Sequence, residues 1–409
     1  MSARALLFVG GLFPSDMIDE INRNSIGQIQ YAAHELQMSL LDGFEVSFPG
    51  EVEILSEPSI GSYPKHYKKW YINGKIFQFG HNIAGKQLPF FNIVGIRDAS
   101  LLSAYKKGIN DWLKQHKSGE RVIVFYSIQG YFSLLAKWIK KKDSAVHIHL
   151  IVPDLPQFTG IGACKFSLTT LYKSYRNHTF KKNQPYLDTY TLVADAMKDS
   201  LGIRADQYVV VEGIANIANS SESRSFENCD DKKTILYTGT LTKKYGVLDL
   251  VDAFRMIPDD RYHLLICGAG ETKQQIERIA EEDPRVEYLG QLPHDQVVDL
   301  QRKVTLLVNP RKGGDEFTKY SFPSKLMEYL NSGTQVLCYR LDGIPKEYDA
   351  YFNYPDDNST QALARAMQML CERHQQDRAD EGKRNQNFIR KKKNPTVQTE
   401  KIVELFLQR

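Results

Sequence analysis

The segment KYSFPSKLMEYLNSG, residues 319–333, contains residue types at a spacing suited to ligand chemistry. A turn with Ser and Pro leads into a predicted helix that starts near Pro323 and ends at Gly333. Lys325 and Glu328 are three positions apart, so they share one face of this helix. The free N–H groups of a helix start bind anions, and a carboxylate one turn further in can accept hydrogen bonds from a ribose diol. The alternative is an exposed Lys/Glu pair worth about 0.2–0.5 kcal/mol.

Three loops in this half of the chain contain glycine, and the first and third also contain lysine: residues 237–246 (YTGTLTKKYG), 267–271 (CGAGE) and 311–325 (RKGGDEFTKYSFPSK). Because the carboxyl ends of parallel strands meet at one edge of a sheet, we expect these loops to meet there and to suit a diphosphate. The residues concerned are Gly239, Gly268, Gly270, Gly313, Gly314, Lys243, Lys244, Lys319, Ser324 and Lys325. None of the loops is a Walker loop or a GxGxxG fingerprint, since Lys273 stands where the third Gly would be. Each loop alone is equally compatible with a tight turn.

The elements that would position these loops are short apolar runs that alternate with amphipathic stretches, a pattern typical of parallel strands alternating with helices. The apolar runs of the first half are residues 5–10, 121–127, 146–152 and 189–194, and the helical stretches are 28–41, 101–115 and 131–142. The second half repeats this alternation from residue 234 to the helix at 360–375. The fold class predicted is therefore α/β, with two doubly wound domains.

The predicted domain boundaries follow changes in composition. Residues 1–212 form the first domain, a polar stretch at 213–232 is the linker, and residues 233–385 form the second domain. Residues 386–409 hold a basic segment and a helix from Pro395, which we expect to pack back on the first domain. Within the first domain, Asn73-Gly74 between alternating aromatic flanks predicts a type I′ hairpin.

The composition is that of an ordinary globular chain, with 409 residues of which 42% are hydrophobic and 25% charged. No run approaches the ~18–20 apolar residues of a membrane-spanning helix. We interpret residues 5–9 as a buried strand and not a secretory signal, because Gly10-Gly11 ends the run early. Five separated cysteines without a CxxC pattern favour a reducing cytoplasm and no zinc site. A net charge of +4 is too weak for a nucleic-acid binder of this size.

Four segments of the second half, 238–254, 263–271, 286–310 and 322–337, resemble the C-terminal nucleotide-sugar domain of family 4 retaining glycosyltransferases. Residues 9–16 and 188–201 of the first half are more weakly similar to the same family. The FPSK form of the nucleotide loop is most similar to enzymes that build bacterial capsule, exopolysaccharide or O-antigen chains. The resemblance implies a GT-B fold, in which two Rossmann-like domains face each other across a cleft.

The activity implied by this resemblance is transfer of a sugar from a nucleotide diphosphate sugar, expected to be a UDP-sugar, to a glycan or lipid-linked acceptor. Retention of configuration by front-face substitution is the implied route. The leaving diphosphate would be stabilised by cations and helix starts, so no metal and no cofactor are expected.

The family's site residues are carried over position by position. The second glutamate of its acidic motif matches Glu328, expected on the donor ribose, whereas the first falls on Tyr320. The phosphate-clamping Arg and Lys fall on Thr240 and Tyr245. Lys243, Lys244 or Lys325 could restore this positive charge, because a diphosphate needs cations at the right place and not at one sequence offset. We predict Lys325 and Tyr320 at the transferred sugar and leaving phosphate, with Ser324 toward phosphate.

On the acceptor side the predicted residues are Gly10, Gly11 and Asp154. Asp154 follows an apolar run near the place of a family histidine, and it could position or deprotonate the acceptor hydroxyl. The alternative for Asp154 is a turn cap. We expect His147 and His149 to be buried strand residues.

Three stretches of the first half, 64–71, 134–142 and 165–182, mix basic and aromatic residues. This pattern suits an anionic bilayer surface, so we expect a cytoplasmic protein at the inner face of the membrane. The alternative is three separate solvated faces. Because no nucleic-acid module appears, RNA binding is not predicted.

Two rival functions share the predicted fold. A sugar-nucleotide epimerase would need catalytic carboxylates and histidines that the sequence does not locate. A noncatalytic partner subunit would keep the fold without the chemistry, and Thr240, Tyr245 and Tyr320 favour it.

Overall fold

The structure is a computed structural model, and it describes residues 4–27, 29–155, 168–215, 232–314 and 316–407. The chain forms two compact units. The first comprises Met1–Ile214 together with Pro395–Arg409, and the second comprises Ala215–Asn394. The segment predicted as the tail, 386–409, is thus divided between the two units. Most of the predicted linker, 213–232, lies outside the described residues.

The described part of the first unit contains an eight-stranded sheet in the order β10-β9-β8-β7-β1-β2-β5-β4. Its strands are β1 (Arg4–Gly10), β2 (Glu51–Ser56), β4 (Lys75–Phe79), β5 (Ile83–Gln87), β7 (Glu120–Tyr126), β8 (His147–Val152), β9 (Thr189–Leu192) and β10 (Tyr208–Val210). All of the pairings are parallel except that of β4 with β5. The carboxyl ends of the parallel strands therefore share one edge of the sheet.

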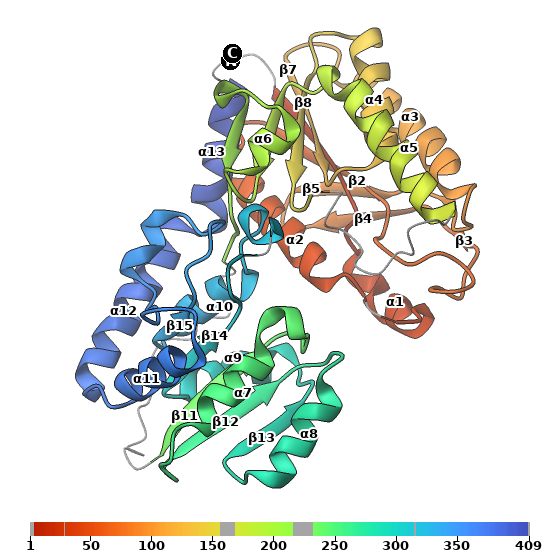
Figure 1. Cartoon of the computed structure of the whole chain (residues 1–409). Coiled ribbons are helices and arrows are strands. Elements are labelled where there is room, and N and C mark those ends of the chain that lie inside the picture. Colours follow the sequence, from red (N-terminus) through yellow and green to blue (C-terminus); the bar gives the residue numbers. More distant parts are fainter. Residues whose placement is uncertain (1–3, 28, 156–167, 216–231, 315, 408–409) are drawn as a thin grey trace. The chain divides into compact units, whose positions relative to one another are not determined.

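The helices of this unit cover the sheet. They are α1 (Ile18–Asn24), α2 (Tyr31–Ser47), α3 (Arg97–Gln115), α4 (Gly130–Lys142), α5 (Leu168–Asn183), α6 (Met197–Leu201) and α13 (Pro395–Leu407). Helices α3, α4 and α5 lie side by side (Figure 1). Of the predicted basic aromatic stretches, residues 165–167 lie outside the described residues, and so do the side chains of residues 168–173.

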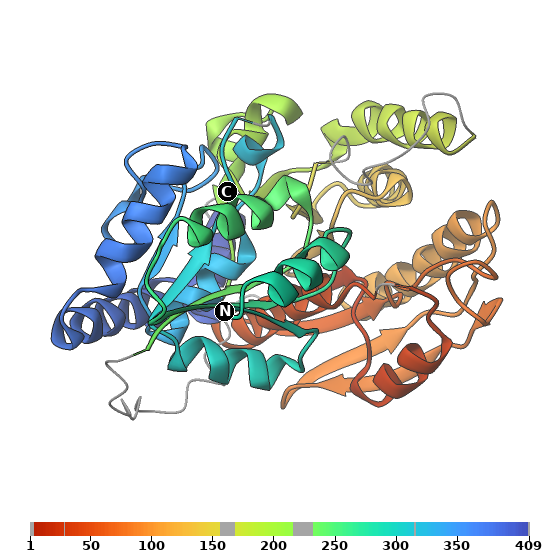
Figure 2. The same cartoon turned by 60° about the horizontal axis from the view of Figure 1, so that its bottom comes forward.

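The predicted hairpin at Asn73-Gly74 is wrong. Residues 71–72 (β3) pair with Phe90–Phe91 (β6) in a separate small sheet, while β4 pairs with β5 at the sheet edge (orange in Figure 2). The turn that joins β4 to β5 begins at Gly80, which has φ 56°. Glu45 accepts hydrogen bonds of 3.0 Å from the backbone N–H groups of two residues of this turn, His81 and Asn82. Gly74 is not among the residues with positive φ that a type I′ turn requires.

Helix α13 completes the core of the first unit. It packs against α2, where Gly43 leaves room for the close approach, since a Cβ there would overlap the carbonyl oxygen of Pro395. The Phe406 ring lies against His149 with 4.8 Å between ring centres. As predicted, His149 is a buried strand residue, and both of its ring nitrogens bond to threonine hydroxyls of β9. The neighbouring His147 is half-buried and also bonds to a β9 threonine, Thr189.

The second unit contains a five-stranded parallel sheet in the order β13-β12-β11-β14-β15. The strands are β11 (Lys233–Thr238), β12 (Tyr262–Cys267), β13 (Val286–Gly290), β14 (Leu306–Asn309) and β15 (Val336–Cys338). The helices are α7 (Val247–Arg255), α8 (Lys273–Glu282), α9 (His294–Lys303), α10 (Ser324–Ser332), α11 (Thr360–Cys371) and α12 (Gln375–Lys392). Helix α7 packs on α11, and α10 contacts both α9 and α12.

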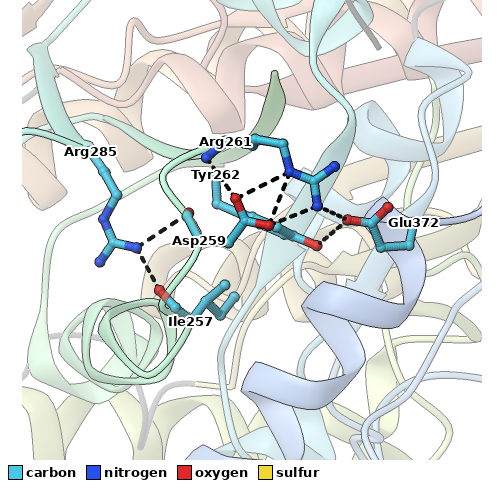
Figure 3. Close-up of polar contacts among 6 residues, drawn as sticks. All are labelled: Ile257, Asp259, Arg261, Tyr262, Arg285 and Glu372. Atoms are coloured by element: carbon cyan, nitrogen blue, oxygen red, sulfur yellow. Dashed lines mark hydrogen bonds and ion pairs between the residues drawn. The ribbon is translucent and has the colours of Figure 1, made fainter. Parts of the chain in front are cut away.

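A polar network fixes the amino end of β12 in this unit. Figure 3 shows its members, which are Ile257, Asp259, Arg261, Tyr262, Arg285 and Glu372. The Arg261 Nη2 atom lies 2.7 Å from the Asp259 carboxylate and 3.1 Å from the Glu372 carboxylate. Glu372 comes directly after the last residue of α11. Because β12 runs from Tyr262 to Cys267, this network lies at the opposite end of the strand from the 267–271 loop. It therefore supports the sheet without touching the predicted ligand edge.

Candidate active site

The first two glycine loops of the second unit are in direct contact. The Gly239 N–H donates to the Cys267 carbonyl at 3.0 Å, and the Leu241 N–H donates to the Ala269 carbonyl at 2.9 Å. Gly268 has φ 148°, and a Cβ on it would overlap the Gly239 carbonyl oxygen. Glycine is required here because the two backbones approach too closely for any side chain. The loops after β11 and β12 thus form one rim.

The third loop joins the same rim. A Cβ on Gly246, which has φ 74°, would overlap the Pro310 carbonyl oxygen, so the end of the first loop lies against the start of the third. The next residue, Arg311, places its guanidinium 5.3 Å from the centre of the Tyr245 ring. The three loops that the sequence singled out are therefore brought together at the carboxyl edge of the sheet.

Hydrogen bonds hold helix α10 against the end of β11 at this rim. The Tyr329 hydroxyl accepts a hydrogen bond from the Thr238 N–H at 2.8 Å and lies 3.2 Å from the Thr238 carbonyl oxygen. Pro323 precedes the first helical residue, Ser324, and no side chain caps the helix start. Among the residues that the structure describes, no side chain accepts from the first N–H groups of α10, and such groups favour an anion.

Glu328 occupies a fixed position one turn inside α10. Both of its carboxylate oxygens accept from the Lys325 ammonium, at 2.9 and 2.8 Å, and one also accepts from the Gln301 amide. The fully buried Gln301 in turn donates to the Thr238 hydroxyl at 3.2 Å. The Glu328 side chain keeps 23% exposure and Lys325 keeps 35%. The Lys/Glu pair considered as the structural alternative does form, and Gln301 orients it toward the end of β11.

Arg311 is a residue of this rim that the sequence did not single out. It is only 8% exposed, and its Nη2 donates to the Ser321 hydroxyl at 2.8 Å. Its guanidinium lies 4.3 Å from the centre of the Phe317 ring, and the Lys244 ammonium lies 3.2 Å from the same centre. A basic residue directly after a buried strand, as in VTLLVNPR, is the signal that could have identified it.

The remaining predicted residues of the second unit lie around the rim. Thr240, Lys243, Gly270 and Ser324 are exposed, and Tyr320 is half-buried at the end of a short 3₁₀ helix, Glu316–Tyr320. The carboxylate of Glu271, which follows Gly270, accepts from the Thr242 hydroxyl at 2.8 Å and from the Lys243 N–H at 3.2 Å. These two hydrogen bonds lower the pKa of Glu271. Glu271 thus ties the two glycine loops together as a carboxylate.

The predicted acceptor residues lie at the carboxyl edge of the first unit's sheet. Gly10 ends β1, and the Gly11 N–H donates to the Gln37 side chain at 2.7 Å. Asp154 follows β8, two strands away from β1 in the sheet, so these residues share an edge without being neighbours. The Asp154 side chain reaches solvent, while the protein packed around it raises its pKa by desolvation.

A buried carboxyl group lies at this edge as well. Glu57 comes directly after β2, is 7% exposed, and accepts from the Tyr131 hydroxyl. Its N–H donates to the Gly10 carbonyl at 3.0 Å. Burial raises the pKa of Glu57 to about 7, and the Arg97 guanidinium opposes this shift. Nothing in the local sequence around Glu57 predicts its burial.

Metal-ligating side chains come together at one place among the described residues, the amino end of β2. Glu51, Glu53 and His116 converge there, and His116 Nε2 lies 2.7 Å from the Glu53 carboxylate. This group is at the opposite end of β2 from Glu57. Within the described ranges, no helix combines the length and apolar character needed to cross a membrane.

Comparison with known proteins finds a matching family for part of the second unit. Residues 232–373 match the family described as Glycosyl transferases group 1. This match lies within the second unit and leaves the first unit uncovered. The segment is a glycosyl transferase domain, which confirms the prediction of an enzyme of the glycosyltransferase class. No curated protein sequence matches the chain.

Solved structures match along nearly the whole chain. The sucrose-phosphate synthase of Thermosynechococcus elongatus is 14% identical, with a TM-score of 0.64 over 99% of this chain and 98% of that one. The lipopolysaccharide outer core galactosyltransferase WaaB is 15% identical, with a TM-score of 0.61 over 99% of both chains. Anabaena HepE in complex with UDP is 14% identical, with a TM-score of 0.61 over 99% of this chain and 100% of that one. The chain has the GT-B fold. The GT-B prediction is confirmed, and at these identities the likeness establishes the fold alone.

Proposed function

We propose that this protein is a retaining glycosyltransferase that moves a sugar from a UDP-sugar to a glycan or lipid-linked acceptor in bacterial surface polysaccharide synthesis. The observation that carries the proposal is the rim of the second unit. There two interlocked glycine loops, an uncapped helix start and a fixed carboxylate, Glu328, converge at the carboxyl edge of a parallel sheet. That combination suits a nucleoside diphosphate.

The proposed roles follow from charge. Cleavage of the anomeric C–O bond leaves a negatively charged diphosphate and an oxocarbenium-like sugar. The N–H groups of α10 and the Lys325 ammonium would stabilise the developing negative charge, which is the larger part of such catalysis. Glu328 would accept from the two ribose hydroxyls. Tyr320 would lie near the transferred sugar, and Asp154 would position the acceptor hydroxyl.

The UDP donor is supported by Anabaena HepE, whose structures hold UDP, and UDP with glucose. A role in surface polysaccharide is supported by WaaB and by WaaG, which is involved in lipopolysaccharide biosynthesis. We place the protein in the cytoplasm at the inner membrane face, on the basis of the basic aromatic stretches. The exposed Trp70 of the 64–71 stretch supports that placement.

The test uses the full-length protein. Thermal unfolding is measured with UDP, ADP, GDP and uridine, followed by hydrolysis assays with the sugar conjugates of the nucleotides that stabilise it. We expect stabilisation by UDP and slow release of UDP from a UDP-sugar, with transfer when a lipid-linked acceptor is added. No shift with any nucleotide would refute the proposal. Binding without turnover would favour a noncatalytic partner subunit, the alternative that Tyr320 supports.

A further inference from the structure

In the first unit, the segment that follows β2 holds the loop that follows β1. Three hydrogen bonds join them, from the Glu57 N–H to the Gly10 carbonyl at 3.0 Å, from the Ser59 N–H to the Gly11 carbonyl at 3.1 Å and from the Ser56 hydroxyl to the Leu12 carbonyl at 2.9 Å. Three consecutive carbonyls, those of residues 10–12, are therefore bonded to residues 56–59. The loop held in this way contains the two glycines predicted on the side of the glycan acceptor.

The Glu57 side chain ties this segment to a further strand end. Its Oε1 atom accepts from the hydroxyl of Tyr131, the second residue of α4, which follows β7. The Tyr131 ring stacks on the Tyr105 ring with 6.2 Å between ring centres, and the Tyr105 hydroxyl donates to the Gly10 carbonyl at 3.4 Å. Glu57 therefore joins the loops after β1 and β2 to the start of α4.

The Glu57 carboxyl group is poorly provided for as an anion. It is 7% exposed, and among the residues that the structure describes its Oε2 atom has no hydrogen-bond partner. The Arg97 guanidinium donates elsewhere through its Nη1 atom, to the Ile60 carbonyl at 2.8 Å and to the Asn92 side chain at 3.1 Å. Because a buried carboxylate needs hydrogen bonds or an ion pair, burial raises the pKa of Glu57 to about 7.

Other charged or titratable groups face Glu57 from three helices. They are Arg97, Asp98 and Tyr105 of α3, Tyr131 of α4 and Arg176 of α5. The two arginines favour the ionised carboxylate and Asp98 opposes it, but burial has a larger effect on the pKa of Glu57 than any of them. Burial also raises the pKa of both tyrosines, so their hydroxyls stay protonated.

We propose that the protonated Glu57 side chain positions the Gly10–Gly11 loop, so that the order of this loop is coupled to pH. Glu57 is a positioning residue, because it acts through the backbone of residues 10–12. When the loop opens, Glu57 reaches water and releases its proton, so opening becomes easier as pH rises from about 4.5 through 7 and changes little above that. The proposal rests on the proposed function, which assigns this loop to the glycan acceptor, and it adds pH control of that side of the reaction.

Hydrogen–deuterium exchange measured by mass spectrometry reports loop opening without a nucleotide or a glycan acceptor. Full-length wild type and Glu57→Gln are compared from pH 5 to pH 8, with rates corrected for the pH dependence of amide exchange itself. Glutamine keeps an oxygen that accepts from Tyr131 but cannot ionise. We expect the protection of residues 9–14 in wild type, relative to Glu57→Gln, to fall about 10- to 30-fold from pH 5 to pH 7 and then to level off.

Two controls isolate the effect of Glu57. His34 also titrates at this loop, because the Phe13 N–H donates to its Nδ1 atom at 3.2 Å, and burial lowers the pKa of His34. Protonation of His34 at low pH weakens the loop in both proteins, so the ratio of wild type to Glu57→Gln cancels it. Glu53→Gln removes a half-buried carboxyl group of β2 itself and is the matched control, which should follow the pH profile of wild type.

The outcomes are distinct. A ratio for residues 9–14 that does not change with pH overturns the proposal, because Glu57 then has a structural role alone, even if the free energy of unfolding depends on pH. Protection equal to that of residues 121–126 in β7 at every pH also overturns it, since the loop then opens only when the whole unit unfolds.

A second variant decides the question should Glu57→Gln fail to fold. Tyr131→Phe removes the hydrogen bond that favours the ionised carboxylate, so the pH at which the protection of residues 9–14 levels off must rise. An unshifted pH profile in Tyr131→Phe overturns the proposal. Failure of UDP to stabilise the protein would defeat the proposed function without altering any of these exchange ratios.

Discussion

Replacement of Glu328 by alanine tests the ribose role that the site assigns to this carboxylate. In the structure Glu328 accepts from Lys325 and Gln301 and is 23% exposed. The Lys325 pair is partly solvated, so its loss costs folding about 0.5 kcal/mol or less. Gln301 keeps its bond to Thr238 and loses one acceptor, which adds about 1 kcal/mol. The free energy of unfolding should therefore fall by about 0.5–1.5 kcal/mol, and the variant should remain folded.

The effect on nucleotide binding should be larger. A carboxylate that accepts from two ribose hydroxyls makes charged hydrogen bonds, so its removal should cost UDP binding about 1–3 kcal/mol, or roughly 5- to 150-fold in Kd. The measurement is calorimetric titration with UDP and with 2′,3′-dideoxy-UDP. Because the dideoxy ligand lacks both hydroxyls, the alanine substitution should change its affinity little, and the double-mutant cycle should isolate the ribose contact.

Glu277→Ala is the matched control. Glu277 forms an i,i+4 pair with Lys273 at 3.5 Å on α8 of the same unit. Its removal takes away a carboxylate of the same kind that has no proposed ligand role, so UDP affinity should be unchanged. The ribose assignment is refuted if Glu328→Ala and Glu277→Ala bind UDP with the same affinity, or if Glu328→Ala weakens UDP and dideoxy-UDP equally.

Three further predictions concern the loops, the buried carboxyl group and metal dependence. Gly268→Ala should lower the free energy of unfolding in urea by more than about 2 kcal/mol, because its Cβ would overlap the Gly239 carbonyl oxygen. The control is Gly290→Ala, which has φ 69° and open space around the new Cβ and should lower it by only about 1 kcal/mol. Equal losses of unfolding free energy in the two variants would contradict the close contact between the two glycine loops. Because the pKa of Glu57 is raised from 4.5 to about 7 in the folded protein, the folded state keeps a proton that the unfolded chain releases, so the unfolding free energy falls as pH rises from about 4.5 through 7. Glu57→Gln should remove this pH dependence, so that its free energy of unfolding relative to wild type rises by up to about 3 kcal/mol between pH 5 and pH 8. If the unfolding free energies of the two proteins change with pH in parallel, the argument from burial of Glu57 is wrong. UDP-sugar hydrolysis should be unaffected by EDTA, and a loss restored by Mg²⁺ would show that the diphosphate is held by a metal.

Most helices and strands were predictable, because their hydrophobic periodicity is local. The apolar run at 121–127 became β7, and the helix expected at 131–142 became α4, each to within a residue. The Asn73-Gly74 hairpin failed because pairing with a distant partner decides which turn forms. Residues 71–72 pair with β6, and Lys75–Phe79 pair with β5, so the turn falls at Gly80.

The candidate site was predictable where glycine and lysine follow strand ends. Its exact partners were not, because they depend on which strands become neighbours. Gln301 donates to Glu328, which is 27 positions later in the sequence. Arg311 lies against the Tyr245 ring because their loops follow the neighbouring strands β14 and β11. Glu57 likewise became a buried acid only through Tyr131, 74 residues away. Contacts of this range leave no local pattern in a single sequence.

The return of α13 to the first unit has a consequence for synthesis of the chain. Ile402, Val403 and Phe406 belong to the same hydrophobic cluster as Leu6 and Phe8 of β1. On the ribosome, all of residues 215–394 are made before these three side chains exist. The second unit can therefore fold before synthesis of the chain ends. The core of the first unit stays incomplete until residues 402–406 have been made. A nascent chain halted before residue 395 lacks these three side chains, so it should expose the gap in the core of the first unit to chaperones.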